Sequence, residues 1–303
     1  MSARARTWRG FLAVAAAATL WGISGVLAKT LFNRQIPPWT VIEIRLTAAF
    51  ALLLAVLLAG RRPLRVGREQ LPMLALLGAV TACTQFLYYF TISLTNVSTA
   101  IFLQYTAPIF VALYSRAVEG EPLGPAKTAA IACAVAGSYS LVGGGSGIRI
   151  SPLGLASGLL SAVAFGVYSI LGRGRVRQVG STTALLYALG SGALLWSVLV
   201  PPWQAYRGHD AATWAVLAVI VVFATVLPFW LFLTGLRAIS PSAASLTASV
   251  EPVVGSLAAY LLLDERLGAW QIAGAALIAC GVGLIQAADL RAADARPVMP
   301  APD

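Results

Sequence analysis

Long apolar segments, each about the length of a bilayer crossing, dominate the chain. Charged residues make up only 11% of the sequence, against about 25% in a soluble domain, and they gather between apolar runs of roughly 20 residues, the length of one helical crossing. The runs do not alternate apolar and polar residues as barrel strands do, so we expect helices. Ten spans are predicted, at 10–31, 38–59, 71–92, 97–117, 125–142, 152–172, 181–201, 212–236, 241–262 and 268–287.

The sequence also repeats itself, at an offset of 144 residues and without a gap. The aligned pairs include Trp21 with Phe165, Lys29 with Arg173, Ser98 with Ser242, Pro108 with Pro252 and Glu121 with Glu265. Each copy holds five predicted spans, and an odd number brings the second copy into the membrane from the opposite face. We therefore expect an all-α polytopic membrane protein of ten transmembrane helices. Two inverted five-helix repeats, 1–142 and 152–287, would be joined by a flexible glycine-rich link and followed by a short cytoplasmic tail, 288–303.

The basic residues lie mainly on one side of the predicted membrane. The net charge of +10 is also compatible with nucleic-acid binding. However, if the N-terminus is cytoplasmic, fifteen of the 21 Lys and Arg residues fall in inside segments and five in outside segments. This distribution follows the positive-inside rule, so we expect the cell inner membrane, cytoplasmic N- and C-termini and no nucleic-acid partner. A cleaved signal peptide over 1–28 is disfavoured, because this segment has a repeat partner.

Motifs for soluble-domain chemistry are missing. The sequence has no Walker loop, no His-Glu-x-x-His and no Cys-x-x-Cys, so ATP-driven pumping by this chain is excluded and neither a cofactor nor a metal is expected. Cys83, Cys133 and Cys280 fall far apart inside spans, and the single histidine, His209, falls in a loop. A membrane-embedded enzyme would need paired carboxylates or a His/Asp/Ser set at one depth, whereas Glu251 stands alone in its span.

Glu251 is the main candidate for a transport residue. It lies about ten residues into the span 241–262, roughly 15 Å deep, and a carboxylate near the bilayer midplane is typical of a functional site. We interpret it as a proton-coupling or substrate-binding group; the alternative is a structural carboxyl bound to a neighbouring helix. Pro108 and Pro252 occupy equivalent positions in two spans, where each frees a carbonyl four residues earlier, so we expect hinges or kinks there.

Further polar and aromatic residues are placed where they would line the same cavity. The predicted cavity residues are Trp21, Ser24, Tyr88, Gln104, Tyr105, Tyr168, Trp230, Thr247 and Glu251. Tyr88 and Trp230 lie near span ends, where an aromatic belt is the alternative interpretation. Lys29, Arg45 and Arg173 are expected to act as charged gates or as snorkelling anchors. Arg45, which lies within a span, is expected to bind a carbonyl or carboxylate of another helix.

These features resemble a known family. The Leu20-Trp21-Gly22 opening, Arg45, the paired segments 107–124 and 251–268 and the closing segment 271–285 are similar to the EamA-type transporters of the drug/metabolite transporter superfamily. The resemblance covers nearly the whole chain. It implies ten helices around a central cavity lined by spans 1, 3, 4, 6, 8 and 9, with spans 5 and 10 at the periphery. The motifs are specific for the fold and weak for the substrate.

We therefore predict a secondary transporter that exports small metabolites, most simply amino acids or related compounds, by alternating access around a midplane cavity. Proton antiport through Glu251 is one mechanism, and facilitated diffusion is another. A multidrug or organic-cation exporter is the alternative within transport, because an aromatic, acidic cavity favours cations. The membrane-embedded enzyme is the alternative of another class. The expected partners are a small-molecule substrate and the lipid bilayer, with a monomer as the simplest oligomeric state.

Overall fold

The computed structural model describes residues 3–62, 64–95, 97–118, 120, 124–143, 150–255, 257 and 268–294. Within these ranges the chain is helical and contains no strand. The elements are α1 (Ala3–Asn33), α2 (Pro38–Ala59), the 3₁₀ turn η1 (Arg68–Gln70), α3 (Leu71–Leu94), α4 (Val97–Gln104), α5 (Ala107–Val118), α6 (Pro125–Gly143), α7 (Pro152–Val179), α8 (Ser181–Leu199), α9 (Pro202–Ala205), α10 (Ala211–Val219), the π-helical η2 (Ile220–Val226), α11 (Leu227–Gly235), α12 (Pro241–Ala248) and α14 (Ala269–Asp294).

Several helices begin at capping signals that the sequence carries. Ser151, Asp210 and Ser240 precede α7, α10 and α12, and each side chain accepts a hydrogen bond from a backbone N–H of the first turn. Such caps satisfy donors that have no partner inside the helix. Proline occupies the first position of α7 and α12, where its missing N–H costs nothing. The ends of the apolar runs are therefore fixed locally.

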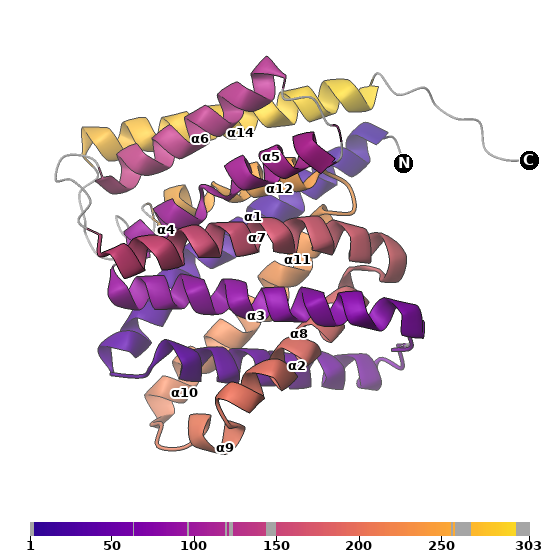
Figure 1. Cartoon of the computed structure of the whole chain (residues 1–303), viewed down its shortest axis with the longest axis vertical. Coiled ribbons are helices and arrows are strands. Elements are labelled where there is room, and N and C mark those ends of the chain that lie inside the picture. The colour runs from indigo at the N-terminus through magenta and orange to yellow at the C-terminus, as the bar shows by residue number, and fades with distance from the viewer. Residues whose placement is uncertain are drawn as a thin grey trace, which may run out of the picture.

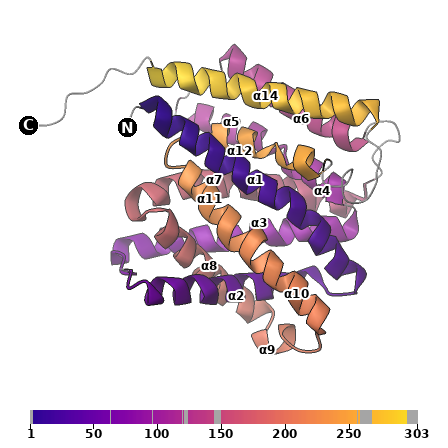
Figure 2. The same ribbon diagram turned by 180° about the vertical axis from the view of Figure 1, so that it is seen from behind.

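The bundle has a pair of helices at each of two opposite edges and the remaining helices between them. α6 and α14 lie side by side at one edge, and α2 and α8 pack together at the opposite edge (Figure 1). Between the edges, α3 packs against α7 on one face, and α1 packs against α11 on the other (Figure 2). α4, α5 and α12 lie between the α6–α14 pair and the rest of the bundle (Figure 1). Spans 5 and 10 of the sequence, which form α6 and α14, are thus peripheral.

The outer surface of the bundle is apolar. Leu194 is 74% exposed and Val198 is 82% exposed, both on α8. A surface of this kind suits lipid, because hydrocarbon does not penalise exposed apolar side chains. Eight helical stretches in the described residues are long and apolar enough to cross a membrane: Arg4–Asn33, Pro38–Ala59, Arg68–Leu94, Thr99–Val118, Pro152–Val179, Ser181–Leu199, Ala211–Gly235 and Ala269–Arg291.

The structure differs from the predicted spans in three places. The span 97–117 is two helices, α4 and α5, because the chain turns at 105–106. α14 continues to Asp294, past the predicted start of the tail at 288, because the Ala- and Leu-rich sequence there favours helix. Predicted spans 125–142 and 241–262 are not among the eight membrane-length stretches. The predicted span 125–142 is the continuous helix α6. The end of the predicted span 241–262 lies outside the described residues. The link 144–149 and the last residues of the tail also lie outside them.

The contact between α6 and α14 is reciprocal. A Cβ on Gly137 would lie 2.7 Å from the carbonyl oxygen of Gly274, and a Cβ on Gly281 would lie 2.7 Å from the carbonyl oxygen of Ala130. Gly137 and Gly281 are repeat partners, and so are Ala130 and Gly274. Because each half presents the same pair of positions to the other, this contact has the self-complementary form that a pseudo-twofold axis produces.

Candidate functional site

Two helices near the centre of the bundle are interrupted at repeat-related positions. α4 and α5 are separated by the turn 105–106, and α12 is separated from the helical segment 251–255 by the turn 249–250. Pro108 and Pro252 each stand second in the new segment, where their missing N–H prevents continuation of the preceding helix. Irregular backbone at membrane depth is tolerated only beside protein or a cavity. The two breaks therefore mark the centre of the molecule as a place for a site.

Glu251 begins the helical segment that follows the second break, and it is only 3% exposed. The Tyr105 hydroxyl donates a hydrogen bond to Oε2 of this carboxyl group at 2.5 Å, and the Tyr88 hydroxyl donates to Oε1 at 3.4 Å. Tyr105 occupies the turn between α4 and α5, so the first break positions a donor for the acid of the second. The close approach of α1 requires Gly22, where a Cβ would lie 2.8 Å from the Glu251 carbonyl oxygen.

The carboxyl group faces a small cavity of about 40 Å³. This is room for about one water, far below the roughly 300–1,000 Å³ of a ligand pocket. The structure therefore holds the site in a nearly closed form. The lining residues are Trp21, Ser24, Arg45, Thr84, Gln85, Tyr88, Tyr89, Gln104, Tyr105, Phe165, Phe229 and Glu251.

One wall of the cavity is aromatic. The Trp21 ring meets Phe229 edge-on with ring centroids 5.1 Å apart, and it meets Phe165 at 6.1 Å. Trp21 and Phe165 are repeat partners, so α1 and α7 contribute equivalent rings. Edge-to-face pairs hold aromatic side chains in defined orientations. The cavity therefore has a rigid apolar wall in addition to the charged groups of Glu251 and Arg45.

Arg45 brings a buried positive charge to the same cavity. Its Nε donates to the Thr225 hydroxyl at 3.0 Å and its Nη2 donates to the Ala224 carbonyl at 2.9 Å. That carbonyl lies four residues before Pro228, which has no N–H to bond it, and it lies within the π-helical segment η2. The guanidinium carbon also lies 4.6 Å from the centre of the Tyr89 ring. Arg45 therefore binds a backbone carbonyl that lacks its usual donor four residues later.

The structure does not bring every predicted cavity residue to the cavity, and three placements are corrected. Trp230 points away, with its indole N–H bonded to the Thr182 hydroxyl at 3.0 Å, because the adjacent Phe229 takes the inward direction. The Thr247 hydroxyl donates to the Ala243 carbonyl inside α12 at 2.7 Å. The third, Tyr168, is fully buried behind the cavity wall, where its ring packs on Phe229 and Phe232 with centroids 5.5 and 5.9 Å apart. Lys29 and Arg173 are half-buried and do not line the cavity.

Comparisons with known proteins identify the architecture. A family model described as the EamA-like transporter family matches residues 8–143 and again residues 152–287. The chain belongs to the EamA-like transporter family. An uncharacterized inner membrane transporter of Salmonella typhimurium, YicL, is 29% identical over 301 residues, which cover 92% of this chain and 95% of the relative. The threonine/homoserine exporter RhtA of Escherichia coli is 26% identical over 278 residues, which cover 90% of this chain and 89% of the relative.

A solved crystal structure has the same fold as this EamA-family chain. It superposes with a TM-score of 0.73 at 20% identity and covers 92% of this chain and 96% of that chain. At this identity the similarity concerns the fold alone. Taken with the apolar helices and the family match, the chain is a multi-pass membrane transporter of the drug/metabolite transporter superfamily.

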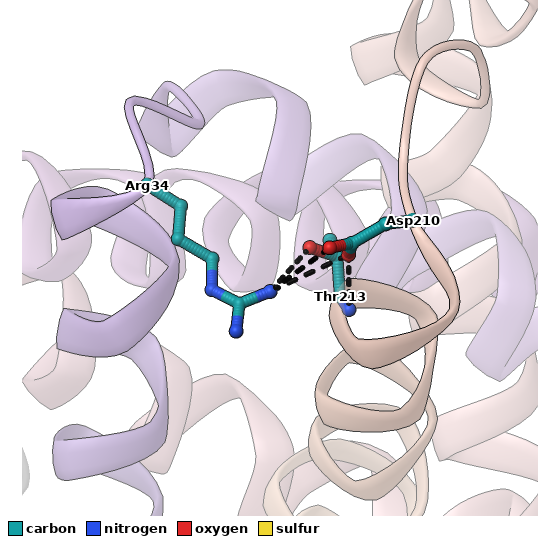
Figure 3. Close-up of polar contacts among 3 residues, drawn as sticks. All are labelled: Arg34, Asp210 and Thr213. Atoms are coloured by element: carbon teal, nitrogen blue, oxygen red, sulfur yellow. Dashed lines mark hydrogen bonds and ion pairs between the residues drawn. The ribbon is translucent and has the colours of Figure 1, made fainter.

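A second polar cluster joins the two halves of this EamA protein away from the cavity (Figure 3). Nη1 of Arg34 lies 3.4 Å from Oδ1 of Asp210 and donates to the Thr213 hydroxyl at 3.1 Å. Oδ1 of Asp210 also accepts the Thr213 backbone N–H at 2.7 Å. Hydrogen bonds from Thr213 hold the pKa of Asp210 below its usual value, with a smaller effect from Arg34. These residues lie on the side that the charge distribution predicts to be outside.

Sequence reasoning missed several residues of the site. Thr84 and Gln85 line the cavity from the middle of α3, and the rule that singled out Glu251, a polar residue deep in an apolar span, applies to Gln85 as well. Phe229 was hidden by its neighbour Trp230, because two adjacent aromatic residues in an apolar run carry no signal for which one faces inward. The π-helical turn η2 had one indicator, the proline at its end.

Proposed function

We propose that this transporter exports amino acids or closely related small metabolites. The observation that carries the proposal is a buried carboxyl group, Glu251, held by two tyrosine hydroxyls in a cavity that also contains the buried cation Arg45. Charged groups this deep in a membrane protein mark a substrate or ion pathway. RhtA relatives named threonine/homoserine exporters, 27% and 26% identical to this chain, support the choice of amino acids and of export.

Alternating access is the mechanism proposed for this movement. The two broken helices, with their prolines at equivalent positions, would let each half rock against the other around the cavity. In this proposal ten spans form two inverted repeats, the termini are cytoplasmic, and the protein resides in the inner membrane. The closed 40 Å³ cavity would widen toward one side at a time. Glu251 would carry a proton in one direction and release it when substrate binds.

The test is counterflow in proteoliposomes containing the full-length wild-type protein. Radiolabelled neutral and aromatic amino acids are loaded one at a time, and each is followed with and without an imposed pH gradient. Exchange of at least one amino acid, with net movement that responds to the gradient, is the expected result. Exchange that is indifferent to the gradient leaves a facilitator, and no exchange of any amino acid overturns the proposed substrate class.

A multidrug or organic-cation exporter is the second candidate. It is favoured by one feature, the aromatic wall of Trp21, Phe165 and Phe229 beside a carboxylate, because cations bind well to aromatic faces. Competition by methyl viologen separates the two proposals. An amino-acid exporter shows unchanged amino-acid counterflow in the presence of methyl viologen. An organic-cation exporter instead transports methyl viologen itself, and methyl viologen inhibits any amino-acid exchange that is seen.

A further inference from the structure

Gln85 is a buried amide that makes no hydrogen bond to any described residue. It is 4% exposed and lines the cavity from α3, and both its Nε2 and its Oε1 lack a partner in the described part of the chain. A buried amide without partners is costly, of the order of a few kcal/mol. The side chain is therefore placed for a polar group that the protein itself does not supply.

Arg45 and Glu251 share this cavity without pairing with each other. In the described residues no ion pair involves either one. Arg45 is bound by a hydroxyl, a carbonyl and a ring face, and Glu251 by two hydroxyls. The hydrogen bonds of Arg45 use Nε and Nη2, two of the five N–H donors of a guanidinium. Arg45 and Glu251 are thus a buried cation and a buried anion that are each bonded by uncharged groups. A molecule that carries one positive and one negative charge is complementary to this pair.

Helix α3 brings one tyrosine to each of the two charged groups of the cavity. Tyr88 reaches Glu251, whereas the adjacent Tyr89 stacks on Arg45. Gln85 lies four residues before Tyr89 and three before Tyr88, so it shares the face of α3 that carries both tyrosines. Gln85 and Arg45 line the same small cavity. An amide N–H and a guanidinium N–H together are suited to a carboxylate, since both donate to its oxygens.

We propose that Arg45 and Gln85 form a carboxylate subsite and Glu251 an ammonium subsite, so that the cavity selects zwitterionic α-amino acids over amines, organic cations and simple acids. This inference rests on the proposed function for the movement of the substrate but concerns its binding alone. Gln85 is the specificity determinant, because it has no structural bond to maintain. The nearly closed cavity admits the substrate only after the helices around it separate.

The proposal predicts opposite effects of one substitution on stability and on binding. Gln85→Leu replaces an unpartnered buried amide by an apolar side chain of similar size, so the unliganded protein becomes more stable and its melting temperature rises. The same change removes a donor to the carboxylate and weakens amino-acid binding by about tenfold or more. A structural glutamine would give the reverse, with lower stability and unchanged affinity.

The experiment measures ligand-induced thermal shifts of the full-length protein in detergent, titrated to obtain dissociation constants. Two sets of probes are used. The first is L-threonine with 1-amino-2-propanol, which lacks the carboxylate, and 3-hydroxybutyrate, which lacks the ammonium. The second is L-phenylalanine with phenethylamine and 3-phenylpropionate. The variants are Gln85→Leu, Gln85→Glu and a matched control, Gln70→Leu, whose amide oxygen is also buried without a partner but outside the cavity.

The expected result is that at least one amino acid binds the wild type about tenfold or more tightly than both of its parts. Gln85→Leu then loses that preference, Gln85→Glu repels the carboxylate and prefers the amine, and Gln70→Leu behaves as wild type. Amines that bind as tightly as amino acids, no zwitterion binding at millimolar concentration, or an unchanged preference in both Gln85 variants would overturn the inference. Zwitterion binding without counterflow leaves the inference standing and removes the export proposal instead.

Discussion

At the residue scale, the site depends on one carboxyl group of the second repeat whose position is set by hydrogen bonds from two tyrosines of the first repeat. Tyr105 donates to Glu251 at 2.5 Å and Tyr88 donates at 3.4 Å. The shorter contact is the stronger one, because hydrogen bonds weaken steeply with distance. Tyr105 lies in the α4–α5 turn. The conformation of this helix break therefore determines where the hydroxyl that binds Glu251 is placed.

Tyr105→Phe removes that bond and keeps the ring. We expect amino-acid counterflow to fall by about tenfold, since a hydrogen bond to a charged group contributes about 1.5–3 kcal/mol. Tyr88→Phe should have a smaller effect because its contact is longer. Tyr114→Phe, on the exposed side of α5, is the control and should match the wild type. Equal losses in all three variants would mean that the effect is general destabilisation rather than loss of a contact with Glu251.

Asp210 gives a pH prediction at the same scale. Thr213 and Arg34 hold its pKa below the ordinary value of 3.8. The stabilisation by this carboxylate is therefore complete above that value and disappears as the pH falls through the lower folded-state pKa. Asp210→Ala should lower the melting temperature by roughly a degree or two between about pH 5 and about pH 8, because the pair is exposed. The difference should shrink in more acidic buffer, and a difference that grows on acidification would refute this reading.

At the element scale, interruptions of helices concentrate around the cavity. The turns 105–106 and 249–250 and the π-helical η2 all adjoin residues that line it. Each interruption breaks the regular series of backbone hydrogen bonds of an α-helix, and each is followed within a few residues by a proline. The peripheral helices α6 and α14 are unbroken. The candidate site and the helix irregularities therefore lie in the same elements, as is common for strained or broken backbone at sites.

The α6–α14 pair offers a stability test with an internal control on one helix. A Cβ on Gly281 would approach the Ala130 carbonyl to 2.7 Å, whereas nothing lies within 4 Å of one on Gly283. Gly281→Ala should cost about 1–3 kcal/mol of unfolding free energy through overpacking. Gly283→Ala should be neutral or stabilise by up to about 1 kcal/mol through helix propensity. Unfolding in detergent measures both, and equal destabilisation would show that the close contact is not what matters.

At the scale of the whole molecule, symmetry accounts for what the sequence made predictable. The offset of 144 residues relates not only Gly137 and Gly281 but also Gly22 and Gly166. A Cβ on Gly22 would lie 2.8 Å from the Glu251 carbonyl oxygen, and one on Gly166 would lie 4.0 Å from the carbonyl oxygen of the repeat partner, Ala107. The helical spans and their apolar surface follow from composition and from the length of the apolar runs, because lipid imposes strong constraints on sequence. The EamA family follows from the motifs that resemble it.

The asymmetric parts of the cavity were less predictable. Glu251 and Arg45 stand out as charges in apolar spans, whereas the inward direction of Phe229 rather than Trp230 depends on helix rotation. Helix rotation is set by packing across the bundle and leaves no mark in a uniformly apolar run. The π-helical turn that supplies the Ala224 carbonyl to Arg45 is likewise a product of tertiary contacts. Residues of the candidate site were therefore visible in the sequence when they were charged, whereas the uncharged Gln85 and the apolar Phe229 were missed.

The most direct test of the account compares Glu251→Gln with Glu43→Gln in proteoliposomes. Glu43 is the matched control, because it is also fully buried but bonds Ser197 at 2.8 Å and does not line the cavity. The measurement is amino-acid accumulation driven by a pH gradient, beside exchange at saturating substrate. We predict that Glu251→Gln abolishes accumulation while exchange remains measurable, and that Glu43→Gln retains both. Gradient-driven accumulation at the wild-type rate in Glu251→Gln would contradict the central role assigned to this carboxyl group.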